Sequence, residues 1–565
     1  MKKTMSTKAK IILSVASGVV FTSLYYYFAL PAINPMYPGF WFSLALVIAS
    51  FAYPFFLKPK SQGKKRSSAF DNKVVFKSSS DKTVNPIVII AVAAPIAIMA
   101  IGSIISSTFF NARAYASVIE VKEAVFETDM KETNEVTNIA LMDGESAKII
   151  GNRTLGSLSE VVSQYEIAER YTQINYKRTP KKVANLEYAD FFKWMNNRDK
   201  GIPGYVMVDP VGNSADYVKL EKSLKYVDSG YLGDDLMRKL RFSYPTKIFD
   251  WVSFEVDDNG NPFYIVSCMK PKIFPFGAMD VNEVIIFNPV NGESKLYALK
   301  DVPAWVDAVF SGDLAEQKYN WHGTLAGGYI NSVIGNKDCK RTTDDYGYIV
   351  IDDDVWYFTG VTSVTSDESN IGFIISNART GEYKYYPVVG AEEYSAMKAA
   401  EGEVQEKGYT ASFPSLINVS GEATYILVLK DAGGLVKLYA LVNVEQYGIV
   451  ATGSTQAEAM KAYKALLKEN GITDDRPNDD PTDDDKKQTV IVTEINTYTV
   501  DGNTVFYFAT DAGIYFKGML KDNEDLIFIS VDDAVIFTYD DSENDKIKVI
   551  FDFEIIDRTT PADGE

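Results

Sequence analysis

The chain of 565 residues has very little cysteine and histidine. It contains two cysteines, Cys268 and Cys339, and one histidine, His322. Two cysteines exclude a fold held by several disulfides, whereas one bridge between them and two free thiols both stay open. Zinc sites use several His or Cys ligands, so this set predicts no metal centre. A catalytic triad would have to use His322, and no Gly-x-Ser-x-Gly turn accompanies it.

Other catalytic motifs are also missing. The sequence has no Gly-x-Gly-x-x-Gly and no Walker sequence. Two Ser-x-x-Lys pairs occur, Ser267–Lys270 and Ser395–Lys398. The first falls in a predicted strand, where the two side chains do not share a face, and the second lacks the Ser-Asp-Asn and Lys-Thr-Gly elements that accompany it in penicillin-binding enzymes. We therefore name no catalytic, cofactor-binding or metal-ligating residue.

Charge is missing from three long apolar segments near the N-terminus. They run over Ile11–Ile33, Phe40–Leu57 and Ile87–Phe110. A helix needs about 20 apolar residues to cross a bilayer, and the second segment is at the short end of that range. The first is too long for the apolar region of a signal peptide, and no small-x-small site closes it. Residues 1–110 are therefore predicted to form a membrane anchor of three helices.

The basic residues around these segments predict their orientation. Residues 1–10 carry four lysines, and the loop 58–84 carries eight basic residues against two acidic ones. Positive loops stay in the cytoplasm. The N-terminus and the loop 58–84 are thus expected inside, and residues 111–565 are expected outside. The apolar segments contain no ionisable residue that would mark an ion pathway.

The part of the chain after residue 110 is strongly acidic. It holds 45 basic and 74 acidic residues, because 12 of the 57 basic and 2 of the 76 acidic residues of the chain precede it. Its net charge of −29 repels the phosphates of nucleic acids, so no nucleic-acid partner is expected. The expected partners are the lipid bilayer and either another envelope protein or further copies of this chain.

Residues 111–200 are predicted to form a mainly helical membrane-proximal region. Helices are expected over Ala114–Asp129, Ser157–Tyr171 and Tyr188–Asn196, with a strand over Tyr171–Ala184. The helical spacing of apolar residues supports the second of these helices.

Residues 201–467 are predicted to form a repeated α+β ectodomain. Four passages share an apolar strand, a turn with Asp or Asn, and an alternating strand: 205–218, 284–299, 372–388 and 438–453. Asp209, Asn288 and Asn377 can each accept a bond from their own backbone two residues on. Strand pairs precede three of the passages, and helices are expected at Pro303–Phe310, Glu392–Gly402 and Thr455–Leu467. The repeating unit would be β-β-β-β-α, unless this pattern is common to any antiparallel sheet.

The C-terminal region is predicted to be a separate small domain. Residues 468–488 have seven aspartates, no large apolar run and no Asp spacing typical of a calcium loop, and so predict an acidic linker. Residues 489–565 contain five or six expected strands, one of them over Leu526–Val531. This number indicates a small β-barrel of OB or SH3-like type.

Two of the turns resemble a known module. Asn288-Pro-Val-Asn-Gly-Glu293 and Asn377-Ala-Arg-Thr-Gly-Glu382 resemble the Asp/Asn-x-x-Thr-Gly-Glu turn of PepSY-type extracytoplasmic domains. Those domains bind or restrain secreted peptidases or other envelope proteins, which implies a binding role. The whole chain also resembles multi-pass membrane proteins of Gram-positive bacteria and their phages, a resemblance that implies no activity.

The sequence thus favours a membrane-anchored, non-catalytic binding or scaffold protein of the cell envelope. The alternatives are an envelope-active hydrolase that uses acidic residues of the ectodomain, and a transport accessory subunit. A cleft lined by carboxylates would favour the hydrolase, whereas an open face or groove rich in tyrosine would favour binding.

Overall fold

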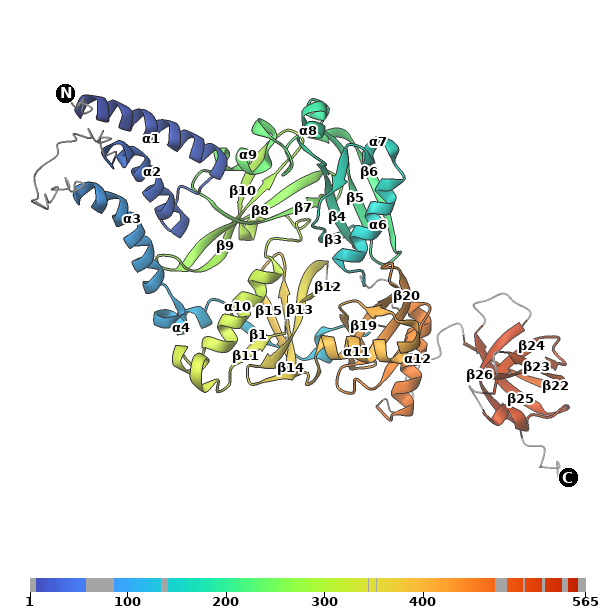
Figure 1. The fold of residues 1–565 in the computed structure, drawn as a ribbon. Helices are drawn as coiled ribbons and strands as arrows, with labels where there is room; N and C mark the ends of the chain where they lie inside the picture. The colour runs from blue at the N-terminus through green and yellow to red at the C-terminus, as the bar shows by residue number, and fades with distance from the viewer. Residues whose placement is uncertain are drawn as a thin grey trace, which may run out of the picture. The chain divides into compact units, whose positions relative to one another are not determined.

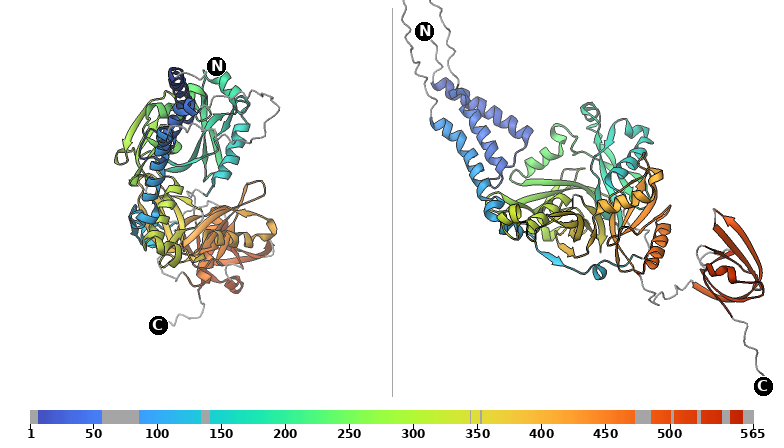
Figure 2. Two further views of the ribbon diagram at one scale, coloured as in Figure 1. Left: turned by 60° about the vertical axis from the view of Figure 1, so that its left-hand side comes forward. Right: turned by 60° about the horizontal axis from the view of Figure 1, so that its bottom comes forward.

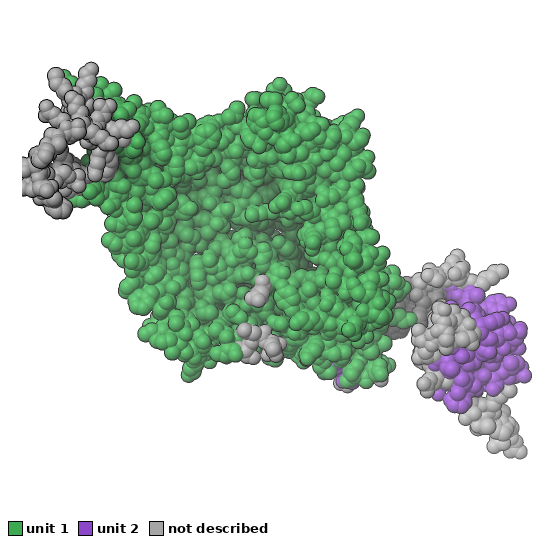
Figure 3. All heavy atoms as spheres, viewed as in Figure 1, with its two compact units in different colours: residues 1–470 green, residues 471–565 purple. Residues whose placement is uncertain are grey.

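The chain forms two compact units, residues 1–470 and residues 471–565 (Figure 3). The computed structural model describes residues 7–56, 86–133, 141–343, 345–351, 353–472, 485–500, 503–520, 524–540 and 547–556. The basic loop 58–84 and most of the acidic linker 468–488 lie outside these ranges.

The first unit begins with three helices that are long and apolar enough to cross a membrane. They are α1 (Thr7–Ala29), α2 (Pro38–Phe56) and α3 (Pro86–Ile105), which lie side by side in Figures 1 and 2. Ser14 Oγ donates to the carbonyl of Phe51 at 2.5 Å, and Ser17 Oγ donates to that of Ser50 at 3.3 Å. Small and hydroxylated residues of this kind let apolar helices approach closely.

The expected helix over Ala114–Asp129 does not exist. α3 ends at Ile105, and a short kinked helix, α4 (Thr108–Ala116), follows. The chain then forms a strand, β1 (Val121–Glu123), and one helical turn, α5 (Phe126–Asp129). β1 pairs in parallel with a strand more than 250 residues later, β15 (Tyr383–Tyr386). The backbone N–H and C=O groups of this segment, which would bond within a continued helix, therefore bond to β15 at the edge of a sheet.

The first sheet contains residues from both sides of position 200, so the boundary predicted there falls inside this sheet, and the segment 111–200 holds strands as well as helices. Helices α6 (Gly144–Gly156), α7 (Ser159–Val162) and α8 (Phe191–Asn197) flank it. Only α7 remains of the helix expected over Ser157–Tyr171, because Tyr165 and Ile167 are buried in a strand. The strands are β2 (Tyr165–Ile167), β3 (Thr172–Tyr176), β4 (Thr179–Tyr188), β5 (Ile202–Asp209) and β6 (Ser214–Leu224).

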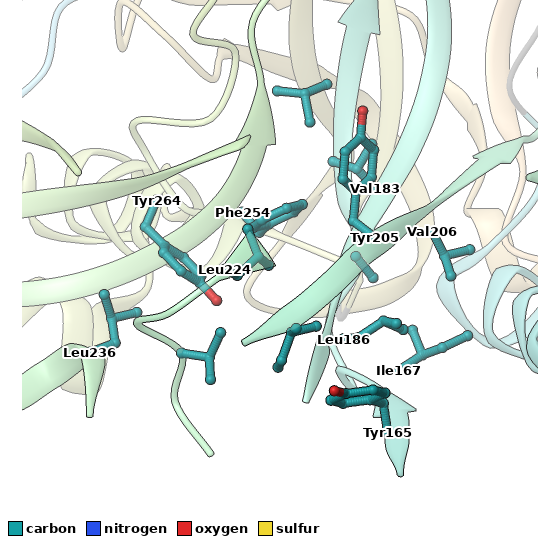
Figure 4. Packing of buried hydrophobic residues seen from close by; sticks show 14 of the residues in the cluster. Tyr165, Ile167, Val183, Leu186, Tyr205, Val206, Leu224, Leu236, Phe254 and Tyr264 are labelled. Carbon is teal, nitrogen blue, oxygen red and sulfur yellow. The ribbon is translucent and has the colours of Figure 1, made fainter. Parts of the chain in front are cut away.

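The second sheet is an antiparallel meander that shares its core with the first sheet. Figure 4 shows rings and aliphatic side chains of both sheets meeting. The ring centroids of Tyr205 and Tyr264 lie 5.8 and 5.5 Å from that of Phe254. A 3₁₀ turn, η2 (Leu232–Asp234), and α9 (Leu236–Ser243) precede it. Its strands are β7 (Ile248–Val256), β8 (Pro262–Ile273), β9 (Gly277–Phe287) and β10 (Ser294–Ala298), and η3 (Leu299–Asp301) follows.

The helix expected at Pro303–Phe310 is absent, because other parts of the fold accept its backbone N–H groups. Asp307 and Ala308 donate to the carboxylate of Glu255 at 2.8 and 2.9 Å. Val309 and Phe310 donate to the carbonyl of Ala378. The helix begins only afterwards, as α10 (Gly312–Leu325), and is capped by Ser311.

The third sheet follows α10 and a π-helical turn, η4 (Asn331–Gly335). It has the order β1-β15-β14-β13-β11, with β12 also on β13 and β16 on β14. Its strands after β1 are β11 (Lys340–Thr342), β12 (Gly347–Ile351), β13 (Asp354–Ser363), β14 (Ser366–Asn377), β15 (Tyr383–Tyr386) and β16 (Gly390–Ala391).

The strands of the fourth sheet lie in the sequence between two helices that were predicted, α11 (Glu393–Glu403) and α12 (Gln456–Glu469). A 3₁₀ turn, η5 (Gln405–Lys407), follows α11. The strands are β17 (Thr410–Ala411), β18 (Ser415–Val419), β19 (Glu422–Lys430), β20 (Val436–Asn443) and β21 (Val450–Gly453). The third and fourth sheets share one core, which includes Phe358, Phe373 and Tyr425.

Three of the four sheets have a first strand that is split in two. β2 and β3 both pair with β4, β11 and β12 both pair with β13, and β17 and β18 both pair with β19. Each of these sheets continues with three antiparallel strands, counting the partner of the split strand, and the third sheet also contains β1 and β16. In the second sheet the corresponding strand, β7, is continuous but has a register shift between Phe249 and Val252.

The turns before the last strands of the second and third sheets have the same hydrogen bonds. Asn288 Oδ1 accepts from the backbone of Val290 at 2.9 Å, and Asn377 Oδ1 accepts from that of Arg379 at 2.9 Å. Gly292 and Gly381 follow with φ of 76° and 73°. In the first sheet, Asp209 takes the place of the asparagine. Asn213, whose φ is 51°, takes the place of the glycine.

The second unit is a closed barrel of five strands. The strands pair in the cyclic order β22-β23-β24-β26-β25, with β24 and β26 parallel. Leu526–Val531 is no strand, because a 3₁₀ helix, η6 (Glu524–Phe528), lies there. The strands are β22 (Asp485–Val500), β23 (Asn503–Thr510), β24 (Tyr515–Met519), β25 (Ala534–Asp540) and β26 (Ile547–Ile555).

The turn at Gly381 generates a test of the fold. A Cβ at Gly381 would lie 2.8 Å from the ring of Phe310, at a φ that disfavours side chains. We expect Gly381→Ala to lower the free energy of unfolding by more than about 1 kcal/mol. Thermal unfolding of the purified full chain in detergent measures this change.

Gly402→Ala is the matched control. A Cβ at Gly402, within α11, would meet no atom within 4 Å, and alanine stabilises helices by roughly 0.5–1 kcal/mol relative to glycine. Equal melting temperatures for the two variants would contradict the assigned turn geometry.

Candidate functional site

The first and fourth sheets meet, so the four sheets of unit 1 form a closed series. Asp143 Oδ1 caps α6 by accepting from the backbone of Ser146 at 2.7 Å. Its other oxygen accepts from Lys430 Nζ, at the end of β19, at 2.6 Å. Burial opposes the ionisation of Asp143, but the bonds from Lys430 and Ser146 outweigh it and lower its pKa. A second contact, from Asn213 Nδ2 to the hydroxyl of Tyr439 at 3.1 Å, joins the same two sheets.

A hollow of about 500 Å³ lies at this junction, and we call it the closure hollow. α6 forms one wall, the β5–β6 turn the second, and the start of β20 the third. Thr154 Oγ1 fastens the first wall to the second by donating to the carbonyl of Ala215 at 3.2 Å. The lining residues are Ser146, Ile150, Arg153, Thr154, Asn213, Ser214, Ala215, Gly434, Leu435, Val436, Lys437, Tyr439 and Ser454.

The charged residues that line the closure hollow are basic, although the protein as a whole is acidic. Arg153 and Lys437 are its charged lining residues, and none of the lining residues described is a carboxylate. Both side chains are exposed, and Lys437 Nζ lies 3.2 Å from Asp431. Hydroxyl and amide groups provide the remaining polar surface. This set offers donors to a negatively charged ligand and has no carboxylate pair for acid–base catalysis.

Two carboxylates with raised pKa values, Glu255 and Asp307, lie elsewhere and are buried. Burial raises the pKa of Glu255 to about 7 and that of Asp307 well above its ordinary value. Glu255 accepts bonds from the backbone of the segment that carries Asp307, and Asp307 accepts from the backbone of Asn175 at 2.6 Å. The pair therefore joins the first and second sheets to the 302–311 segment. Such buried carboxyl groups hold the fold together and do not form an accessible acid–base site.

The residues considered from the sequence do not form a site together. His322 lies on α10, where Nδ1 is 2.9 Å from the carbonyl of Ala116. Cys268 and Cys339 are both buried and free, which excludes a bridge between them in this structure. Ser267 donates to the carbonyl of Val309, and Lys398 of the second Ser-x-x-Lys pair is exposed on α11.

Many tyrosines of unit 1 lie in its core and do not form an open face. The fully buried ones include Tyr205, Tyr383, Tyr386, Tyr425 and Tyr463. Sequence reasoning also missed the closure hollow, because Arg153 and Lys437 are far apart in the chain and neither belongs to a motif.

Comparisons with known proteins assign no family. No protein-family model matches the chain, and no curated protein matches it. Among solved structures, the GH32 beta-fructofuranosidase BmSUC1 of Bombyx mori overlaps 65% of this chain, with 11% sequence identity and a TM-score of 0.19. The chain spans 62% of the length of that enzyme. A TM-score this low transfers neither a fold nor an activity.

The buried carboxylates make stability depend on pH. The pKa of Glu255 rises from 4.5 to about 7 on folding, so the folded chain binds this proton more tightly than the unfolded chain does. Its stabilising contribution is complete below pH 4.5 and is lost as the pH rises through about 7. We expect Glu255→Gln to reduce the fall in melting temperature between pH 5 and pH 8.

The control for this measurement is Glu403→Gln, which changes an exposed glutamate of α11. It should keep the pH dependence of the wild type. In Glu255→Gln, an amide nitrogen replaces one of the two oxygens that accept backbone N–H groups, so the variant loses a hydrogen bond and is less stable at every pH. The informative quantity is therefore the change of melting temperature with pH, and not the melting temperature itself. An unchanged slope in Glu255→Gln would contradict a protonated, buried Glu255.

Proposed function

We propose that this protein is a membrane-anchored, non-catalytic binding or scaffold protein of the cell envelope, with residues 111–565 outside the cytoplasm. Three apolar helices support the anchor, and the basic residues before α1 and after α2 support the orientation. The observation that carries the binding role is the closure hollow, whose charged lining residues are Arg153 and Lys437.

The charge of the closure hollow defines the class of ligand. Two cations among hydroxyl and amide donors favour a carboxylate-bearing segment of another envelope protein, or of a second copy of this chain. The walls come from α6 and from two sheets, which hold the lining residues in place better than loops do. A hydrolase that used acidic residues would need carboxylates at such an opening, and Glu255 and Asp307 are buried away from it.

We also propose that the four sheets arose by duplication of one PepSY-like unit. The shared split strand and the matching turns at Asn288 and Asn377 support this proposal. Apart from β1, the strands of each sheet follow a helix of eight residues or more, namely α6, α9, α10 and α11. We assign the C-terminal barrel to the OB type, because its order, with the third and fifth strands parallel, is that of an OB barrel.

The orientation is testable with single cysteines and a membrane-impermeant maleimide. We expect Lys398→Cys, at an exposed position of α11, to react in intact cells. Ser67→Cys, in the basic loop, should react only after lysis. Cys268 and Cys339 are buried, so the unmodified chain provides a low background. Reaction at position 67 and protection at position 398 in intact cells would reverse the proposed topology.

Binding is testable by charge reversal in the full chain. We expect Arg153→Glu with Lys437→Glu to reduce partner recovery at least tenfold in crosslinking and affinity purification from native membranes, since it replaces two donors with repelling carboxylates. The control, Lys398→Glu with Lys407→Glu, makes the same change of net charge at exposed positions of α11 and η5. Equal recovery for both double variants would remove the closure hollow as the binding site.

A further inference from the structure

The ectodomain touches the end of α1 through α9. Arg241 Nε donates to the carbonyl of Leu30 at 3.0 Å, and Arg238 Nε donates to that of Tyr27 at 3.1 Å. The ring of Phe242 lies 5.5 Å from that of Tyr26, in the last turn of α1. Phe242 is nevertheless 53% exposed. These contacts place an exposed aromatic side chain of the ectodomain beside the end of the helix.

A second contact joins the ectodomain to the end of α3. The tip of the β8–β9 hairpin, residues 273–277, packs against the last turn of that helix. A Cβ at Gly102 would lie 2.4 Å from the ring of Phe276, so the hairpin approaches the helix backbone closely. Tyr115 also donates to the carbonyl of Ser106 at 2.8 Å. Phe274, at the same tip, is 76% exposed.

Exposed apolar residues continue around the end of α3. Phe109 and Phe110 follow it directly and are more than half exposed. The ring of Tyr329 lies 5.1 Å from that of Phe109 and leads into Ile330 and Ile334, which are 72% and 80% exposed. We call the exposed set Phe109, Phe110, Phe242, Phe274, Ile330 and Ile334 the apolar rim. Soluble proteins rarely expose large apolar side chains in such a group.

Basic residues stand beside the rim. Lys270 and Lys272 are exposed on β8, two to four residues from Phe274, and Arg113 is exposed on α4, three residues from Phe110. Lys272 Nζ lies 3.7 Å from the buried Asp280. Apolar side chains bordered by cations are typical of segments that lie in the head-group region of a bilayer.

We propose that the apolar rim inserts into the head-group region of the leaflet that faces the ectodomain, so that unit 1 lies on the bilayer besides being anchored in it. The occupant of this surface is lipid, because the helices beside it are long and apolar enough to cross a bilayer. Phe242 contacts the end of α1, and Phe274 lies at the hairpin tip whose Phe276 approaches the end of α3. The proposal depends on those helices spanning the membrane, as the proposed function does. The proposal adds that Phe242, on α9, and Phe274, between β8 and β9, lie at the same membrane surface.

Fluorescence quenching in liposomes tests this surface. Phe274→Cys and Phe242→Cys are each labelled with an NBD maleimide in the full chain, and the protein is reconstituted into phosphatidylcholine vesicles with or without lipids spin-labelled near the head group. We expect blue-shifted emission at both positions and at least a twofold loss of intensity with spin-labelled lipid. The control is Tyr447→Cys, between β20 and β21, which is 54% exposed and distant in sequence from the helices.

The outcomes separate this inference from the proposed function. Emission at position 274 or at position 242 that matches position 447 would overturn the inference, because a single bilayer surface must cover both. That result would leave the three spanning helices and the closure hollow in place, since the maleimide topology and the charge-reversal binding test them independently. Labelling two positions on different elements guards against a local defect in one variant.

Discussion

The contact between the first and fourth sheets is the constraint on which the arrangement of unit 1 depends. Asp143 and Lys430 are 287 residues apart, and their bond closes a series in which the first and second sheets share one apolar core and the third and fourth sheets share another. Closing so long a segment costs little more entropy than closing a shorter one. The closure hollow lies at the junction that this bond forms.

Buried carboxylates serve the irregular segments between the sheets. Glu255 accepts the N–H groups of Asp307 and Ala308, and Glu393 accepts that of Gly360 at 2.6 Å. Glu187 accepts that of Ser229 at 2.8 Å. A buried backbone donor without a partner is costly, and each of these side chains supplies one. Burial raises the pKa of all three to about 7, so the connections between sheets are sensitive to pH near neutrality.

The three apolar helices and the rest of unit 1 are joined by more than the chain between them. α9, which precedes the second sheet, contacts the end of α1. The β8–β9 hairpin of that sheet contacts the end of α3. Such contacts orient the closed series of sheets relative to the helices. The closure hollow at the junction of the first and fourth sheets is thereby held in a defined orientation relative to these helices, as the proposed binding role requires.

The sequence by itself determined the features that depend on neighbouring residues. The three apolar segments form helices, and the turns at Asn288 and Asn377 form where the local pattern predicts them, because apolar length and side chain to backbone bonds act within a few residues. Only the tertiary structure decided the rest. Residues 303–310 lose their helix to Glu255 and Ala378, and residues 121–123 become a strand on β15. Arg153 and Lys437 meet at one hollow because the chain closes on itself, and no local rule relates residues that far apart.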